Sequence, residues 1–216
     1  MRIWEYILEL LYPSRCAFCR RLTGEGRLMC ESCGKELPYT KGPAQGRKLP
    51  NVSLCLSPLY YEGLVRDSLL RYKFQGLTPY AGIYGDLISK CIDENGISCD
   101  IITWVPLSRQ RLRKRGYDQA RLIAERLSRR SGVPSARLLR KIRNNPAQSG
   151  SGGAEKRRAN VSGVYEALRP ELFAGKTVLL VDDIVTTGAT LSECARVLSR
   201  AGAGKIICAA VARSRT

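Results

Sequence analysis

Residues 178–190 read VLLVDDIVTTGAT, and this stretch decides the fold. Four apolar residues, 178–181, predict a fully buried parallel strand. Asp182 and Asp183 follow where we expect that strand to end, and the turn 186–190 leads into an amphipathic helix. Backbone N–H groups of such a turn attract an anion, while the carboxylates accept hydrogen bonds from sugar hydroxyls or hold Mg2+ through water. The stretch therefore predicts a phosphate site beside a diol or metal site. The alternative is an ordinary βα unit with a solvated acidic turn.

This order of residues resembles the phosphoribosyl pyrophosphate (PRPP) motif of type I phosphoribosyltransferases. The resemblance implies an α/β fold with a parallel sheet flanked by helices, and Mg2+ as the ion that accompanies PRPP. It also implies that Asp182 and Asp183 bind the ribose 2′- and 3′-hydroxyls and orient the ribose for catalysis. The residues that would hold the 5′-phosphate are Thr186, Thr187, Gly188, Ala189 and Thr190.

Four cysteines near the N-terminus are spaced C-x2-C-x10-C-x2-C. Two-residue gaps let paired thiolates point at one ion, and two such pairs complete a tetrahedral shell. The chain contains no histidine, so a structural zinc ion has to be held by sulfur. The alternatives are two disulfides, which a reducing compartment disfavours, and a redox pair, which would not need two copies of the motif. We expect structural zinc, with these ligands: Cys16, Cys19, Cys30 and Cys33.

The positive charge of the chain is concentrated in one segment. The formal net charge is +17, and residues 101–158 contribute +13 of it, with sixteen Lys or Arg against three acids. A basic protein that was merely well solvated would spread its charge more evenly, so a polyanionic ligand is expected. Charge alone does not distinguish pyrophosphate from nucleic acid.

The densest cationic run follows a second predicted strand, residues 100–105. Five of the seven residues 109–115 are basic, and a helix is expected over 118–130. At the carboxyl edge of an α/β sheet such a turn faces the ligand crevice, which places it near Asp182 and Asp183. We take Arg109 and Arg111 as candidate catalytic cations that stabilise a departing pyrophosphate. A solvated basic face, or a patch that follows nucleic-acid phosphates, is the alternative.

The segment P-L-x-x-x-R-x-R-x-R-G-Y-D-Q-A, from Pro106, resembles the corresponding segment of the competence protein F (ComF) family. So do YYEGLVRDSLLRYKFQG upstream and the four-cysteine module. The resemblance implies a pyrophosphate-binding loop made of Val105, Pro106, Leu107, Ser108 and Arg109. It also implies a part in DNA uptake during natural transformation, with single-stranded DNA and a helicase as partners. Asp118 stands where Asn is usual, and its carboxylate is suited to capping the helix that follows.

A stretch of Gly and Ser, residues 149–153, has basic residues on both sides. Between two short predicted strands, such a loop is suited to act as a lid that closes over pyrophosphate. Ser151 replaces the leucine usual in this loop of the family, and a surface linker is the alternative. The lid residues that we expect to contact the ligand are Arg140, Gln148, Lys156 and Arg157.

The chain divides by sequence into two parts. Residues 1–50 comprise a short amphipathic helix, the four-cysteine module and a Gly/Pro/Lys-rich linker, and residues 51–216 form the phosphoribosyltransferase-like domain. No apolar run approaches the ~20 residues of a membrane span, and the N-terminus lacks the features of a signal peptide, so the cytoplasm is expected. Two hypotheses for function remain. One is an Mg2+-dependent phosphoribosyltransferase, and the other is a non-enzymatic protein that handles single-stranded DNA and uses the PRPP site as a regulatory platform.

Overall fold

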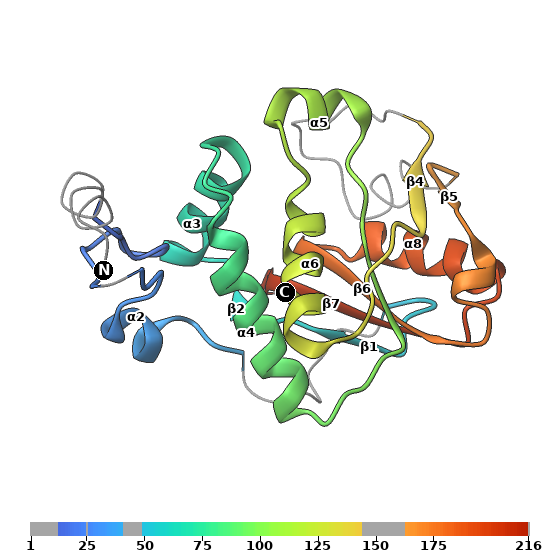
Figure 1. The fold of residues 1–216 in the computed structure, drawn as a ribbon, viewed down its shortest axis with the longest axis horizontal. Helices are drawn as coiled ribbons and strands as arrows, with labels where there is room; N and C mark the ends of the chain where they lie inside the picture. The colour runs from blue at the N-terminus through green and yellow to red at the C-terminus, as the bar shows by residue number, and fades with distance from the viewer. Residues whose placement is uncertain (1–12, 25, 41–48, 144–162, 216) are drawn as a thin grey trace.

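The computed structural model describes residues 13–24, 26–40, 49–143 and 163–215, and a parallel sheet forms its centre (Figure 1). The strand order is β1-β7-β6-β3, and β2 pairs with β7 beyond the end of β1. Every pairing in this sheet is parallel, which confirms the expected fold class. The strands are β1 (Leu54–Leu56), β2 (Leu59–Tyr60), β3 (Ile101–Trp104), β6 (Thr177–Val185) and β7 (Lys205–Arg213).

The central strand is longer than the sequence predicted. β6 pairs with β3 only as far as Trp104 and Val181, but it continues along β7 to the pair Val185 and Arg213. The expectation that the strand ends at Val181 was wrong, because β7 extends equally far and supplies the hydrogen-bond partners. Asp182 and Asp183 therefore lie within β6, at a level of the sheet where β3 has already ended.

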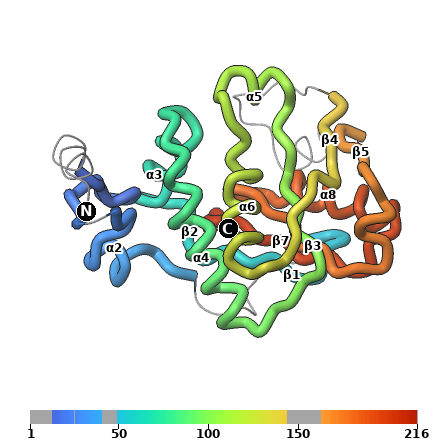
Figure 2. Tube along the Cα trace, in the orientation of Figure 1, coloured from blue at the N-terminus to red at the C-terminus, as the bar shows by residue number. Residues whose placement is uncertain are grey.

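Helices cover both faces of the sheet (Figure 2). On one face, α3, α4 and α6 pack with a cluster that includes Leu179 and Val181. On the other, α8 packs with Val178 and Leu180, together with a small antiparallel pair, β4 and β5. These elements are α3 (Gly63–Phe74), α4 (Tyr80–Glu94), α6 (Gln119–Ser131), α8 (Ala189–Arg200), β4 (Leu139–Lys141), β5 (Tyr165–Ala167) and the 3-10 turn Pro170–Leu172.

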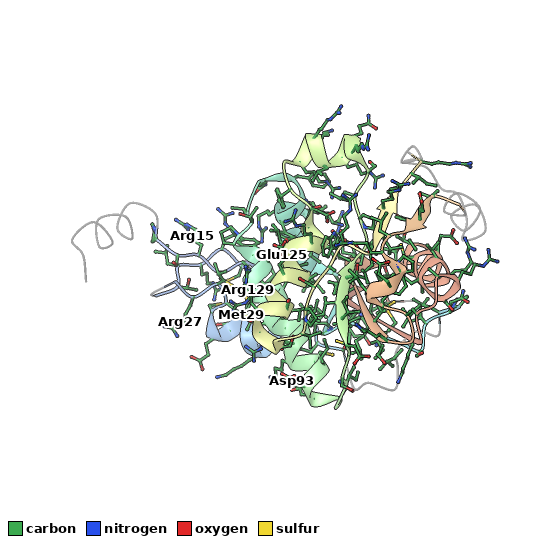
Figure 3. All side chains as sticks on the ribbon, turned by 45° about the vertical axis from the view of Figure 1, so that its right-hand side comes forward. Arg15, Arg27, Met29, Asp93, Glu125 and Arg129 are labelled. Carbon is green, nitrogen blue, oxygen red and sulfur yellow. The ribbon has the colours of Figure 1, made fainter. Side chains whose placement is uncertain are left out.

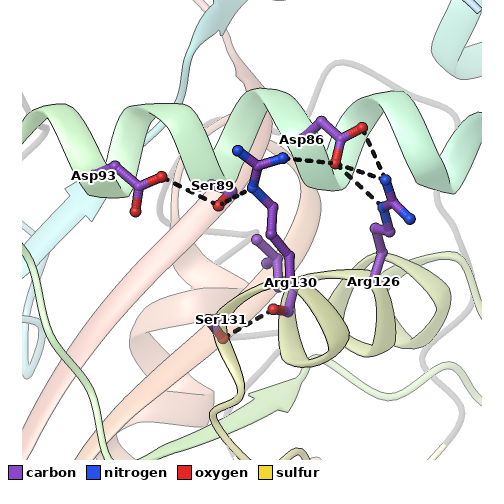
Figure 4. Close-up of polar contacts among 7 residues, drawn as sticks. Asp86, Ser89, Asp93, Arg126, Arg130 and Ser131 are labelled. Atoms are coloured by element: carbon purple, nitrogen blue, oxygen red, sulfur yellow. Dashed lines mark hydrogen bonds and ion pairs between the residues drawn. The ribbon is translucent and has the colours of Figure 1, made fainter.

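α4 and α6 are joined by a polar clasp (Figure 4). Arg126 Nη2 donates to both carboxylate oxygens of Asp86 at 3.1 Å, and Arg130 Nε donates to Ser89 Oγ at 2.9 Å. Gly85 lies directly beneath Arg126, where a Cβ atom would overlap the arginine side chain. This close approach fixes α6, whose first turn reaches the carboxyl edge of the sheet.

The cationic run expected as a turn is a short helix, α5 (Arg109–Arg115), which projects away from the sheet at the top of Figure 1. Ser108 caps it at one end, and Gly116 ends it with φ of 79°. Asp118 caps α6 by accepting from Arg121 N at 3.3 Å, so the predicted helix cap is confirmed. Among the described residues, no helix combines the length and the apolar character that crossing a membrane requires.

The four-cysteine module, residues 13–40 with α2 (Glu31–Glu36), packs against α3 and α4 rather than standing apart. Phe18 is buried and meets the Tyr84 ring edge-on at 6.2 Å. Behind the module, Tyr60 N donates to Pro38 O at 2.8 Å and Thr40 N to Pro58 O at 2.9 Å. The module therefore shares one hydrophobic core with the α/β sheet. The division of the chain at residue 50 stays a prediction.

Candidate functional site

A cavity of about 180 Å³ opens at the carboxyl edge of the sheet, beside the end of β3. The ends of β3 and β6, the loop before α5, the first turn of α6, β4 and β5 all contribute to it. Its walls carry both signs of charge. The lining residues are Lys73, Val105, Pro106, Leu107, Ser108, Arg111, Arg115, Asp118, Gln119, Ala120, Lys141, Tyr165, Asp182, Asp183 and Thr190.

Asp182 and Asp183 both line the cavity but face opposite sides of the sheet, because successive strand residues alternate. Asp183 faces α3, where its Oδ1 lies 3.1 Å from Lys73 Nζ, and its N–H donates to Asp182 Oδ1 at 2.8 Å. Burial, together with the neighbouring Asp183 carboxylate, raises the pKa of Asp182 to about 8. A diol or a cation that replaces lost solvation is the kind of ligand that such a pair favours.

The turn 186–190 closes tightly behind the acidic pair. Gly188 adopts φ of 75°, which favours glycine, and a Cβ atom there would also overlap Leu49. Both the backbone conformation and the packing therefore require glycine. Thr187 Oγ1 accepts from Ala189 N at 3.4 Å, which shapes the start of α8. Of the five residues that we predicted to hold a phosphate, only Thr190 lines the cavity. The others adjoin it in the chain, and their role stays a prediction.

The predicted pyrophosphate loop forms one wall of the cavity and is hydrogen-bonded to β6 and to Asp118. Val105, Pro106, Leu107 and Ser108 all line it, and Val105 N donates to Val181 O at 2.9 Å. Leu107 N donates to Asp118 Oδ2 at 3.2 Å. Burial raises the pKa of Asp118, although the hydrogen bonds that it accepts from Leu107 and Arg121 oppose the shift.

The cations around the cavity differ in part from those predicted. Arg111 lines it, whereas Arg109 is exposed on another side of α5 and does not. Sequence reasoning missed Lys73, Arg115 and Lys141 as lining residues. Within a helix, positions i and i+4 share a face, so the spacing of Arg111 and Arg115 could have identified the latter.

Two of these cations are held by aromatic rings. Arg115 lies over the ring of Phe74 at 5.0 Å and donates to Gln119 Oε1 at 2.9 Å. Lys141 lies over the ring of Tyr165 at 5.4 Å, and burial, followed by the nearby charge of Arg111, lowers its pKa. The ring contacts already restrict both side chains at the cavity wall. Little further side-chain entropy is therefore lost when an anion binds.

The predicted lid lies mostly outside the described residues, since these end at 143 and resume at 163. Gln148, Lys156 and Arg157 fall between these two ranges, outside the described residues. The two short strands that flank the lid are present as β4 and β5. Arg140 lies on β4 but forms an ion pair with Glu166 of β5 at 2.8 Å, and it does not line the cavity.

The four predicted zinc ligands lie close together in the N-terminal module. The sulfur atoms of Cys16, Cys19, Cys30 and Cys33 all lie within 4.8 Å of one another, and Cys19 Sγ lies 3.6 Å from Cys30 Sγ. Zn–S bonds of about 2.3 Å in a tetrahedron place sulfurs ~3.8 Å apart. The residues therefore fit a structural zinc ion, as predicted.

Two observations describe the surroundings of this metal site. The carbonyl of Ala17, between the first two cysteines, accepts from Ser68 Oγ at 2.6 Å and from Arg71 Nη2 at 2.9 Å. On the outer side, exposed arginines cover the module, and Figure 3 shows Arg15 and Arg27 there. The site is thus anchored to α3 on one side and presents positive charge on the other.

Comparison with known proteins assigns both parts of the chain. Residues 113–216 match the model of the phosphoribosyl transferase domain, and residues 7–56 match the double zinc ribbon domain. The competence protein ComFC of Bacillus subtilis is 30% identical over 146 residues, which are 66% of this chain and 56% of that protein. The chain is similar to the ComF competence proteins. Its sulfur cluster is the zinc ribbon, and its sheet is the phosphoribosyltransferase-like fold.

Other relatives agree with this assignment. Competence protein F of Haemophilus influenzae is 35% identical over 104 residues, which are 47% of this chain and 45% of that protein. The DNA utilization protein YhgH of Escherichia coli is 26% identical over 200 residues, covering 88% of this chain and 86% of that protein. The ComF-like chain thus aligns with about half the length of the two competence proteins.

Solved structures with a similar fold are more distant. A glutamine PRPP amidotransferase from B. subtilis has a TM-score of 0.45 and 20% identity, covering 64% of this chain and 30% of that one. An adenine phosphoribosyltransferase from Thermoanaerobacter pseudethanolicus has a TM-score of 0.40 and 19% identity, covering 76% and 79%.

Proposed function

We propose that the cavity at the carboxyl edge binds PRPP and that this ComF-like protein transfers its phosphoribosyl group to an acceptor, with release of pyrophosphate. The observation that carries the proposal is that carboxyl groups and cations line one cavity together. Asp182 and Asp183 line it together with Arg111, Arg115 and Lys141, and the loop 105–108 forms part of the same wall. A ribose diol meets the carboxylates, and the pyrophosphate meets the cations.

Oxygen donors for Mg2+ are also present, since Asp182, Asp183 and Asp118 line the cavity. When bound with PRPP, Mg2+ would neutralise charge on the pyrophosphate. The chain's own residues do the rest. The carboxylates orient the ribose, and the cations stabilise the charge that develops on the leaving group, so catalysis rests on positioning and electrostatics.

The test is a calorimetric titration of PRPP with Mg2+ into the full chain. Asp182→Asn and Asp183→Asn should each weaken binding about tenfold or more, because each replaces a carboxyl group that has two acceptor oxygens with an amide that has one. Asp67→Asn is the matched control, since Asp67 is an exposed carboxylate of α3. Equal affinity in all four proteins would refute the PRPP site.

A second candidate function is the handling of single-stranded DNA during uptake, with a helicase of that process as partner and the cytoplasm as location. The observation that favours it is a set of exposed arginines on the zinc ribbon, Arg15, Arg20, Arg21 and Arg27. The exposed residues Arg113 and Lys114 of α5 form a second basic surface outside the cavity. In this hypothesis the PRPP site serves regulation.

Salt dependence separates the two basic surfaces. Binding of an oligonucleotide should weaken as salt rises, with a slope that falls by ~0.7 for each phosphate contact removed. Comparing the pairs Arg20→Ala/Arg21→Ala and Arg113→Ala/Lys114→Ala assigns the contact to the ribbon or to α5. A slope of zero in the wild-type protein would exclude both.

A further inference from the structure

Lys73, near the end of α3, forms a largely buried ion pair at the candidate site. Its Nζ lies 3.1 Å from Asp183 Oδ1, and the two side chains are only 18% and 13% exposed. Most other ion pairs of the described residues are more open: Lys35 and Glu31 are 72% and 82% exposed, whereas Arg196 and Glu193, at 29% and 9%, are similarly covered. Because solvent screens a covered pair much less, the Lys73–Asp183 contact has structural weight that a surface pair lacks.

The Lys73–Asp183 ion pair offsets electrostatic repulsion among the acidic groups of the cavity. Three carboxyl groups, those of Asp118, Asp182 and Asp183, line one small space, where their charged forms repel one another. Lys73 forms its ion pair with Asp183, through Oδ1. A carboxylate carries lone pairs on both oxygens, so Asp183 can accept from a ligand hydroxyl while Lys73 keeps it in place.

The position of Lys73 is itself fixed from two sides. On one side, Ser68 and Arg71 of α3 donate to backbone carbonyls of the zinc ribbon, with Arg71 Nη2 reaching Phe18 O at 2.8 Å. On the other, Tyr72 OH donates to Gln119 O at 2.9 Å, and Tyr117 OH donates to Tyr72 O. The last turn of α3 is therefore clamped between the ribbon and the start of α6.

We propose that Lys73 is a positioning residue of the acidic pair, which holds the Asp183 carboxylate in the orientation that a ribose diol needs. This inference rests on the proposed PRPP function and adds to it Lys73, which lies in the segment YYEGLVRDSLLRYKFQG but was given no role from the sequence. Lys73 acts through Asp183, on the ribose side of the cavity, and not on pyrophosphate.

The experiment compares three ligands, each titrated with Mg2+: PRPP, ribose 5-phosphate and inorganic pyrophosphate. Lys73→Met should weaken PRPP and ribose 5-phosphate about tenfold, equivalent to ~1.4 kcal/mol, and leave pyrophosphate within about twofold. Lys73→Arg should recover most of the loss, because a cation is restored. Lys90→Met is the control, since Lys90 is an exposed lysine of α4, with 73% of its side chain accessible.

A stability measurement covers the case in which Lys73→Met folds poorly. The measurement is a double-mutant cycle with Asp183→Asn. The free energy of unfolding should fall less in the double variant than the sum of the losses in the two single variants, because the double variant no longer leaves a buried carboxylate without its cation. Purely additive losses would overturn the inference.

The remaining outcomes are also decisive. Unchanged PRPP affinity in Lys73→Met overturns the inference and leaves the PRPP site standing. An equal loss for pyrophosphate does so too, since Lys73 would then contact the anion directly. If the wild-type protein binds none of the three ligands, the proposed function falls, and the positioning role falls with it.

Discussion

Asp118 Oδ2 accepts a hydrogen bond from the backbone N–H of Leu107 at 3.2 Å, while its Oδ1 caps α6. One carboxylate therefore ties the loop 105–108 to the helix behind it, and the loop cannot shift without disturbing the cap. This tie holds the loop in the position from which it lines the cavity.

The first prediction concerns this tie. Asp118→Ala should destabilise the protein by about 1–2 kcal/mol, through loss of the cap and of the loop contact. It should also weaken pyrophosphate binding. Asp118→Asn should fall between wild type and Asp118→Ala, because an amide has one acceptor oxygen and retains one of the two bonds. Urea denaturation and calorimetry check both effects, and a fully stable alanine variant would contradict the assignment.

The second prediction compares two arginines of one helix. Arg111→Ala should weaken pyrophosphate binding about tenfold, as loss of a charge-assisted contact does, whereas Arg109→Ala should change it less than about twofold. Arg111 lines the cavity and Arg109 does not. Similar losses in the two variants would show that α5 as a whole, rather than its inner face, attracts the anion.

The third prediction uses a pair of glycines. Gly188 and Gly132 have φ of 75° and 73°, but only Gly188 has a neighbour, Leu49, that an added Cβ would meet. Gly132→Ala should cost about 1 kcal/mol for backbone strain alone. Gly188→Ala should cost at least about 1 kcal/mol more, from overpacking. Thermal unfolding of the two variants gives the difference, and equal losses would exclude the steric role of Leu49.

The fourth prediction concerns the zinc ribbon. Cys19→Ser should lower the zinc content well below one ion per chain and reduce stability by on the order of 3 kcal/mol, because a structural metal is lost. Cys99→Ser, outside the sulfur cluster, should retain zinc. Metal analysis of protein purified without chelator checks this, and a serine variant with full zinc content would argue against sulfur ligation by Cys19.

The fifth prediction is a pH dependence. The pKa of Asp182 in the folded chain is about 8, well above the ~3.9 of an unfolded aspartate. Between these values the folded state holds a proton that the unfolded state has lost, so stability should fall as pH rises from about 4 to 8. Asp182→Asn should flatten this part of the profile. Denaturation midpoints at several pH values test it, and an identical slope in the variant would refute the shift.

The sequence predicted what lies within continuous motifs. The acidic pair, the loop 105–108 and the four zinc cysteines were identified because each motif brings its residues together over a few positions. Lys73 and Lys141 could not be found in this way, since packing of α3 and β4 against the sheet edge brings them to the cavity. Arg109 was chosen over Arg115 because the run 109–115 was taken for a turn. In a helix, the side chain of Arg109 points elsewhere.

The ring contact between Phe18 and Tyr84 limits which substitutions such a chain can accept during evolution. Ribbon and sheet meet through Phe18, Tyr84, Ser68 and Arg71, all within one packed core. A ribbon exchanged for that of a distant relative would bring a foreign surface onto α3 and α4. We therefore expect aligned homologues to vary at these positions in matched pairs, and chimaeras that join unmatched halves to require compensating substitutions on the helix side.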